Sequence, residues 1–137
     1  MNCFQCEAGQ MISKLSTLKA EVRGESIAVR CRAMVCSRCG FQVLTDPQSS
    51  AYAIASADVY RIKHDLLTTK QLKEIRSNLN MSFREFAKYL KVSEASPKRW
   101  EAGLVQDDAM DELIRLKADL PTARENVKQL KSRLRVA

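Results

Sequence analysis

The stretch SFREFAKYLKVSEASPKRWEAG, residues 82–103, decides the architecture of the C-terminal half of this chain. Ser82 and Glu85 have the spacing of a capping box, in which each side chain accepts a hydrogen bond from the other residue's backbone N–H at the start of a helix. Apolar residues then recur at helical spacing over two turns. Lys91-Val92-Ser93 is too short for anything but a turn, and Gly103 suits the left-handed position after a second helix. The stretch therefore predicts two short helices joined by a tight turn.

Two starting points are open for the second helix. Ser93 is a good N-cap, but Pro97 would then stand at the fourth helical position and remove a backbone hydrogen bond. The alternative is a start at Ser96, with Pro97 in the first turn, where its missing N–H is harmless. Either start gives a helix-turn-helix, whose second helix enters the major groove of DNA. An ordinary pair of packed helices without a DNA role is the competing interpretation.

The order of residues in this stretch resembles the Cro/phage-repressor type of helix-turn-helix. The matching positions are Ser82, Ala87, Leu90, Val92, Ser93, Arg99, Trp100, Glu101 and Gly103. Phe83 departs from the pattern, because that family usually has a phosphate-contacting Gln there, and Pro97 replaces a β-branched core residue. The resemblance implies that Trp100 points into the helix bundle.

The candidate DNA contacts lie on and beside the second helix. Arg99 can donate two hydrogen bonds to O6 and N7 of a guanine, whereas Ala95 offers only an apolar contact to a thymine methyl. Ser96 and Lys98 are candidates for base or backbone contacts, and Arg84 for a phosphate contact. We expect these five residues to form the DNA-binding surface.

The distribution of charge agrees with this assignment. The net charge of +7 is concentrated in residues 68–104, where eight basic and four acidic side chains give +4. Residues 47–67 balance at zero. Phosphate contact requires such a local excess of Lys and Arg.

Four of the five cysteines form two Cys-x-x-Cys pairs, Cys3 with Cys6 and Cys36 with Cys39. Each pair brings two thiolates together at one tight turn, and two pairs complete a tetrahedron around zinc. A glycine that permits such a turn follows each pair, at Gly9 and Gly40. A redox dithiol is the alternative, but one pair would suffice for it. We expect one structural zinc ion per chain, because four thiolates leave no open coordination position.

Residues 27–35, IAVRCRAMV, alternate apolar and other side chains and predict a half-buried strand between the two cysteine pairs. Residues 11–22 supply the preceding strand or strands, with Arg23-Gly24-Glu25 as the hairpin turn. The fifth cysteine, Cys31, falls on the apolar face. It is a small buried hydrophobe or, alternatively, a reactive thiol or spare ligand.

These motifs together resemble the MqsA antitoxins of bacterial type II toxin–antitoxin modules. The resemblance runs from Cys3 to about Leu120 through the first cysteine pair, Gly9-Gln10-Met11, Val22-Arg23-Gly24-Glu25, the second cysteine pair and the Cro-like stretch. It implies that the zinc domain neutralises an mRNA-cleaving toxin and that the C-terminal domain dimerises on a palindromic operator of its own promoter. Arg99 occupies the position of a base-contacting arginine in these antitoxins, whereas Ala95 replaces an asparagine, so we expect a different operator.

The remaining segments predict helices. Asp46 as cap and Pro47 in the first turn start a connecting helix that ends near residues 64–67, where His64 has no special role assigned. Thr68-x-x-Gln71 starts the first helix of the Cro-like bundle. Asp107 or Asp108 caps a helix that ends at Leu120-Pro121, and Thr122 caps a last helix over 122–136. We expect the apolar stripe of that last helix to pack on its own domain or on a twofold partner. The alternatives are that the basic residues of this helix contact DNA phosphates or that the helix binds a foreign partner.

The sequence thus predicts an α+β protein with three parts: a β-rich four-cysteine zinc ribbon (1–46), a connecting helix (47–67), and a five-helix Cro-like DNA-binding domain (68–137). The resemblance implies that the zinc ribbon binds the toxin and that the Cro-like domain dimerises. We expect no enzyme, since one histidine and a closed metal site offer no catalytic group. No apolar run approaches the length of a membrane span and no signal-peptide pattern is present, so we expect a cytoplasmic protein without a membrane partner. A zinc-containing repressor of a phage or mobile element, without a toxin, is the alternative function.

Overall fold

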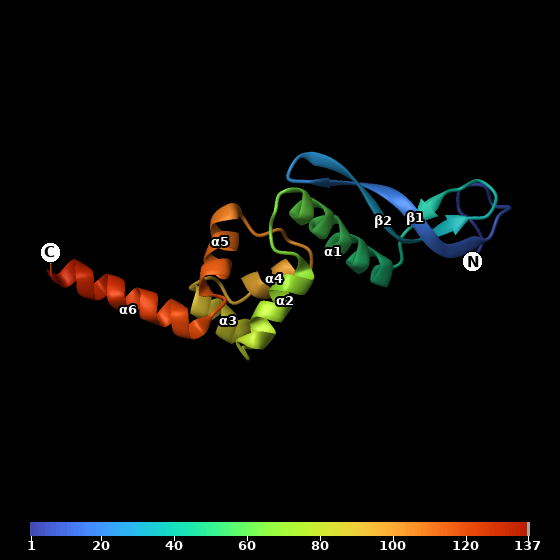
Figure 1. The fold of residues 1–137 in the computed structure, drawn as a ribbon. Helices are drawn as coiled ribbons and strands as arrows, with labels where there is room; N and C mark the ends of the chain where they lie inside the picture. The colour runs from blue at the N-terminus through green and yellow to red at the C-terminus, as the bar shows by residue number, and fades with distance from the viewer. Residues whose placement is uncertain (137) are drawn as a thin grey trace. The chain divides into compact units, whose positions relative to one another are not determined.

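The computed structural model describes residues 1–136 and confirms the α+β class: an antiparallel sheet of three strands precedes six helices in this part of the chain (Figure 1). The elements are β1 (Met11–Val22), β2 (Glu25–Cys36), β3 (Gln42–Val43), α1 (Asp46–Lys63), α2 (Thr69–Asn78), α3 (Phe83–Leu90), α4 (Ser96–Glu101), α5 (Asp108–Lys117) and α6 (Leu120–Val136). They form two compact units. The first comprises Met1–Asp65 with Ala102–Leu104, and the second comprises Leu66–Glu101 and the chain from Val105 onward.

The sheet of the first unit is built on one long hairpin, in the strand order β1-β2-β3. β1 pairs with β2 over their whole length, from Met11 opposite Cys36 to Val22 opposite Glu25. Arg23 and Gly24 form the hairpin turn, with φ of 51° and 79°. A two-residue turn whose twist matches that of its strands requires positive φ at both residues. The predicted alternation is confirmed, because the apolar positions of β2 are buried: Ile27, Val29, Cys31, Ala33 and Val35.

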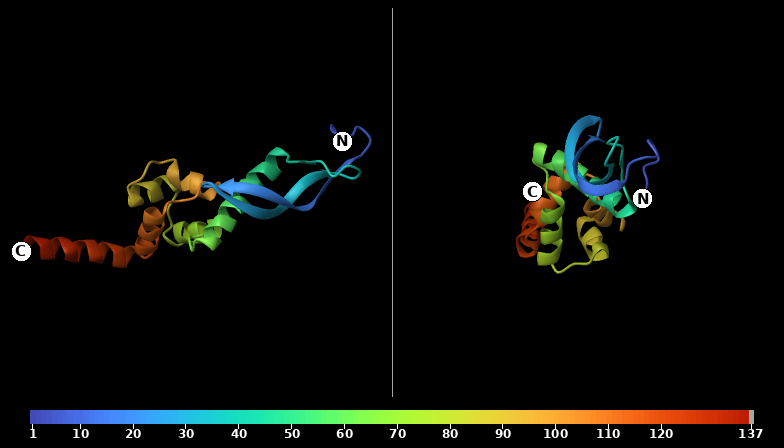
Figure 2. Two further views of the ribbon diagram at one scale, coloured as in Figure 1. Left: turned by 90° about the horizontal axis from the view of Figure 1, so that it is seen from above. Right: turned by 90° about the vertical axis from the view of Figure 1, so that its right-hand side faces the viewer.

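Helix α1 covers the buried face of this hairpin, and two views show the helix running beside the strands (Figures 1 and 2). Val29 and Ala57 lie in the interior, and the Tyr52 hydroxyl donates a hydrogen bond to the Lys19 carbonyl at 2.6 Å. The predicted cap Asp46 is wrong by one residue. Thr45 is the N-cap, because it forms a reciprocal capping box with Gln48 that satisfies two backbone N–H groups.

The core of the second unit gathers apolar side chains from several of its helices: Leu67, Leu72, Phe86, Leu90, Trp100 and Ile114. The predicted capping boxes at Thr68 and Ser82 are confirmed. α4 begins at Ser96, the later of the two predicted starts, with Pro97 in its first turn. Trp100 is buried, as predicted.

The two predictions on the boundary between the last helices are wrong. α5 ends at Lys117, before the predicted stop, and α6 begins at Leu120 with Pro121 in its first turn, where a proline N–H is not needed. Thr122 therefore caps no helix; its hydroxyl donates a hydrogen bond to Asp119. In the described part of the chain, no helix has the length and apolarity needed to cross a membrane.

Candidate metal centre and nucleic-acid interface

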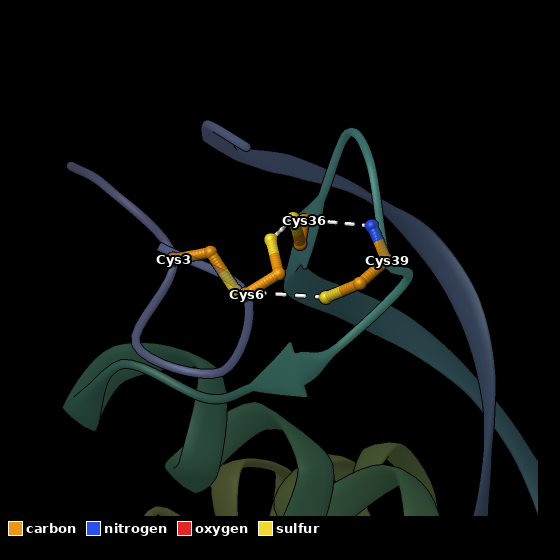
Figure 3. Close-up of side chains that lie close together, drawn as sticks. All are labelled: Cys3, Cys6, Cys36 and Cys39. Atoms are coloured by element: carbon orange, nitrogen blue, oxygen red, sulfur yellow. Dashed lines mark hydrogen bonds between the residues drawn. The ribbon is translucent and has the colours of Figure 1, made fainter. Parts of the chain in front are cut away.

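Four cysteine side chains converge at one end of the hairpin (Figure 3). Cys3 and Cys6 come from the loop before β1, and Cys36 and Cys39 from the end of β2 and the turn after it. Their Sγ atoms all lie within 4.8 Å of one another, and the Cys3–Cys39 and Cys6–Cys36 pairs are 3.6 Å apart. A tetrahedral ion with metal–sulfur bonds of ~2.3 Å separates its sulfur ligands by ~3.8 Å. The four thiols therefore fit one metal ion.

Backbone N–H groups point at the sulfurs and favour thiolates. The Arg38 and Cys39 N–H groups donate to Cys36 Sγ at 3.3 and 3.4 Å, and they lower the pKa of Cys36 to about 6, with the Cys39 N–H contributing most. The Ala8 N–H is the largest cause that lowers the pKa of Cys6. The Phe41 N–H acts in the same direction on Cys39, but desolvation and the neighbouring sulfurs outweigh it and raise the pKa to about 12. Metal ligation requires deprotonated thiols, so these donors support binding.

Glycine is required at position 9 because a side chain would not fit there, and not because of the backbone conformation. A Cβ atom on Gly9 would lie 2.3 Å from Cys36 Sγ and 2.9 Å from Arg38 Cβ. Gly40, by contrast, has φ of 75° and open space around it. The spacing of the cysteine pairs predicted that glycines permit the turns, and for Gly9 the physical reason is close approach to a ligand.

The fifth cysteine is not part of the cluster. Cys31 is buried on the apolar face of β2, opposite Ser16 of β1, and burial raises the pKa of its thiol. This environment agrees with the interpretation of Cys31 as a small buried hydrophobe.

The candidate DNA contacts lie on the surface of the second unit. Ala95, Lys98 and Arg99 are exposed and Ser96 is half-buried, whereas Pro97, Trp100 and Glu101 hold the inner side of α4. Arg84 of α3 lies beside the start of α4, because its guanidinium forms an exposed ion pair with Glu94 at 3.0 Å. The structure therefore brings Arg84 next to the segment that carries the other four residues. Contact of these residues with DNA stays a prediction.

The sequence model of the family described as "Antitoxin component of bacterial toxin-antitoxin system, MqsA" matches residues 1–128. The chain belongs to the MqsA antitoxin family. The match spans the cysteine cluster, the α3–α4 pair and the first half of α6. A search of curated proteins found no match.

This MqsA-family antitoxin exposes apolar side chains that the sequence did not single out, in the loop of the first cysteine pair and on β1. Phe4, inside the first cysteine pair, is 77% exposed, and Ile12 and Leu15 of β1 are each 51% exposed. β1 is an edge strand of the sheet. Exposed apolar groups beside an unpaired strand edge are typical of protein-binding surfaces. The pattern of residues 11–22, which puts apolar residues on both faces of the strand, hinted at Ile12 and Leu15 but not at Phe4.

The sequence also missed the polar network that holds α4. Arg76 of α2 forms an ion pair with the buried Glu101 and donates a hydrogen bond to the Met81 carbonyl at 3.2 Å. The same guanidinium lies 4.2 Å from the ring centre of Phe83, the residue that departs from the Cro pattern. A cation over an aromatic face is attracted to it. Phe83 thus helps to orient Arg76.

Proposed function

We propose that this MqsA-family chain neutralises a cognate toxin through its metal-bearing first unit and represses its own operon, as a dimer on palindromic DNA, through its second unit. The toxin is an mRNA-cleaving one, as the resemblance implies. The observation that carries the proposal is that one family match spans both the four-cysteine cluster and the helix pair with exposed Lys98 and Arg99. In this proposal the antitoxin acts in the cytoplasm by binding and not as an enzyme.

Zinc is the ion proposed for the cysteine cluster. Four thiolates arranged as a tetrahedron favour zinc or iron–sulfur chemistry, and the sulfur spacing of 3.6 Å suits a single ion. With all four positions taken by sulfur, the ion would be structural: it would hold the N-terminal loop against the end of β2. Metal analysis of purified protein tests this directly, with one zinc per chain expected. Iron, or a stoichiometry far below one, would contradict it.

The exposed edge strand β1 is the proposed toxin contact: Ile12 and Leu15 are exposed on opposite faces of this strand, and Phe4 lies in the loop before it. These side chains lie on the surface, so polar replacements remove apolar contact without opening a cavity in the core. Induction of the reading frame adjacent to this gene should arrest growth, and the full-length chain should relieve the arrest. The variant Ile12→Asp/Leu15→Asp should lose relief, whereas Arg99→Ala should keep it.

A separate assay tests repression. Arg99→Ala should weaken binding to the operator by about 1–3 kcal/mol, as loss of a bidentate guanine contact does, and should change non-specific DNA binding far less. Lys98→Ala should instead lower the salt slope of binding by about one. Equal loss on operator and random DNA at one fixed salt concentration would make Arg99 a phosphate contact only.

The two assays separate the two activities. Arrest that Ile12→Asp/Leu15→Asp still relieves would move the toxin contact away from β1. If no adjacent reading frame arrests growth, the toxin part of the proposal fails and a metal-containing repressor remains. Operator binding by the wild type, measured by electrophoretic mobility shift, decides whether the proposed repressor function holds.

A further inference from the structure

Helix α6 carries an apolar stripe that its own chain leaves uncovered. Over residues 120–134 only Ala123 is buried, while Val127, Leu130 and Leu134 are 52%, 58% and 69% exposed. Figures 1 and 2 agree that α6 runs away from α5 after its first turn. An amphipathic helix normally buries such a stripe against another element.

The spacing of the stripe is that of a coiled-coil seam. Leu120, Ala123, Val127, Leu130 and Leu134 follow one another at intervals of three and four residues, which are the a and d positions of a heptad repeat. Three of the four side chains that flank the seam are basic, Arg124, Lys131 and Arg133, and the fourth is Asn126. With five basic residues and one acidic residue, 120–136 carries +4. Two copies of α6 packed along this seam would bring like charges together, which disfavours an α6–α6 pair.

The complementary surface lies on α5. Residues 107–119 hold five acidic and two basic side chains, a net charge of −3. Asp108 and Glu112 are exposed one helical turn apart, and Leu116, a further turn along, is 66% exposed. α5 thus presents an acidic ridge, Asp108–Glu112–Leu116, that ends in an apolar side chain. Leu116 offers the apolar stripe an apolar contact, and the Asp108 and Glu112 carboxylates offer partners to its basic flanks.

The ridge and the stripe of one chain do not meet. Only Ala118 and Asp119 separate α5 from α6, yet Leu116 of the ridge and the stripe residues Val127, Leu130 and Leu134 are each more than half exposed. We propose that α6 of one copy packs on the α5 ridge of a second copy, and the reverse, in a twofold dimer. Such reciprocal contact is the isologous interface of closed dimers. The inference rests on the dimeric part of the proposed function and assigns that dimer a surface.

Charge exchange tests the pairing in the full-length protein, with the dimer dissociation constant measured by analytical ultracentrifugation. Lys131→Glu/Arg133→Glu on α6 and Asp108→Lys/Glu112→Lys on α5 should each raise that constant at least tenfold. The combination of all four changes should restore it to within threefold of the wild type, because opposite charges face each other again. All these side chains are exposed, and circular dichroism verifies that each variant is folded. Lys73→Glu, an exposed change on α2, should have no effect.

Each other outcome overturns the proposal in a distinguishable way. A wild-type dimer that neither charge reversal weakens would place the interface elsewhere and leave the dimeric function standing. A wild type that stays monomeric at high concentration would remove the dimer itself. Weakening by both reversals without restoration in the combination would exclude the α5–α6 pairing. If the α6 reversal weakens only DNA binding, or only toxin binding, while the dimer persists, the occupant of the stripe is that partner and not a second copy.

Discussion

The guanidinium of Arg76 donates two hydrogen bonds to the carboxylate of Glu101, from Nε at 2.8 Å and from Nη2 at 3.1 Å. Glu101 is the last residue of α4 and is 7% exposed, so its charge has little access to water. Its hydrogen bonds raise the pKa of Arg76 despite partial burial. This bidentate pair ties α2 to the end of the candidate recognition helix.

Removal of one partner of this pair should destabilise the second unit strongly. Arg76→Leu would leave the buried Glu101 carboxylate without its partner, and such losses cost roughly 3–5 kcal/mol of unfolding free energy. Urea unfolding followed by Trp100 fluorescence measures this. Lys73→Leu, at an exposed position of the same helix, is the matched control and should change stability by less than about 0.5 kcal/mol. Equal stability of the two variants would show that the pair is dispensable.

Gly9→Ala should damage the metal centre. The added methyl would meet Cys36 Sγ at 2.3 Å, so either the ligand or the N-terminal loop must shift. We expect a lower metal content and a metal affinity at least tenfold weaker. Gly24→Ala is the control, because its φ of 79° adds strain of about 1–2 kcal/mol but no atom lies within 4 Å of the new methyl. Full metal content in both variants would contradict the steric argument.

Metal removal should act on the first unit alone. Trp100 is the one tryptophan of the chain and belongs to the core of the second unit, so its fluorescence reports on that unit. A chelator should expose the four clustered thiols to a thiol reagent and loosen the cysteine end of the hairpin, while Trp100 emission stays constant. A shift of the Trp100 emission toward that of the unfolded protein would show that the second unit also depends on the metal.

Glu94→Gln should strengthen DNA binding. Glu94 pairs with Arg84 at 3.0 Å, and both side chains are more than two-thirds exposed, so the pair adds at most about 1 kcal/mol to stability. Its removal frees Arg84 for phosphate and deletes a negative charge beside α4. We expect a steeper salt dependence and a several-fold higher affinity for DNA of any sequence. Glu74→Gln is the control for the charge change, and an equal gain there would attribute the effect to net charge.

The hairpin of the first unit should lose an interaction in acid. The Glu25 carboxylate accepts hydrogen bonds from Lys63 and His64, and the Lys63 contact is the larger cause that lowers the pKa of Glu25. Because the pKa of Glu25 is lower in the folded state, the contribution of its contacts to the free energy of unfolding is complete above the unfolded-state pKa of about 4.3. That contribution is lost as the pH falls through the folded-state pKa. The stability difference between wild type and Glu25→Gln should therefore shrink between about pH 5 and pH 3. A constant difference over that range would contradict this assignment.

The parts of the fold that the sequence predicted correctly depend on local physics. The capping boxes at Thr68 and Ser82, and the alternation of residues 27–35, are set by neighbours within four residues along the chain. The error at Asp46 arose because Thr45 and Asp46 are both capable caps, and only the side chain of Gln48 selects between them. The boundary at 118–122 was misplaced because a proline can end one helix or begin the next.

By itself, the sequence determined which residues could bind metal, which segment forms the helix pair, and where basic charge gathers, since spacing and composition carry that information. Only the tertiary structure decided which residues that are distant in the sequence come into contact. It placed Asp111 in the core, where its carboxylate accepts hydrogen bonds from the Leu67 N–H and the Gln106 amide at 2.8 and 3.0 Å. It also set the Arg76–Glu101 pair and the uncovered stripe of α6. Such contacts depend on packing directions, which no local pattern encodes.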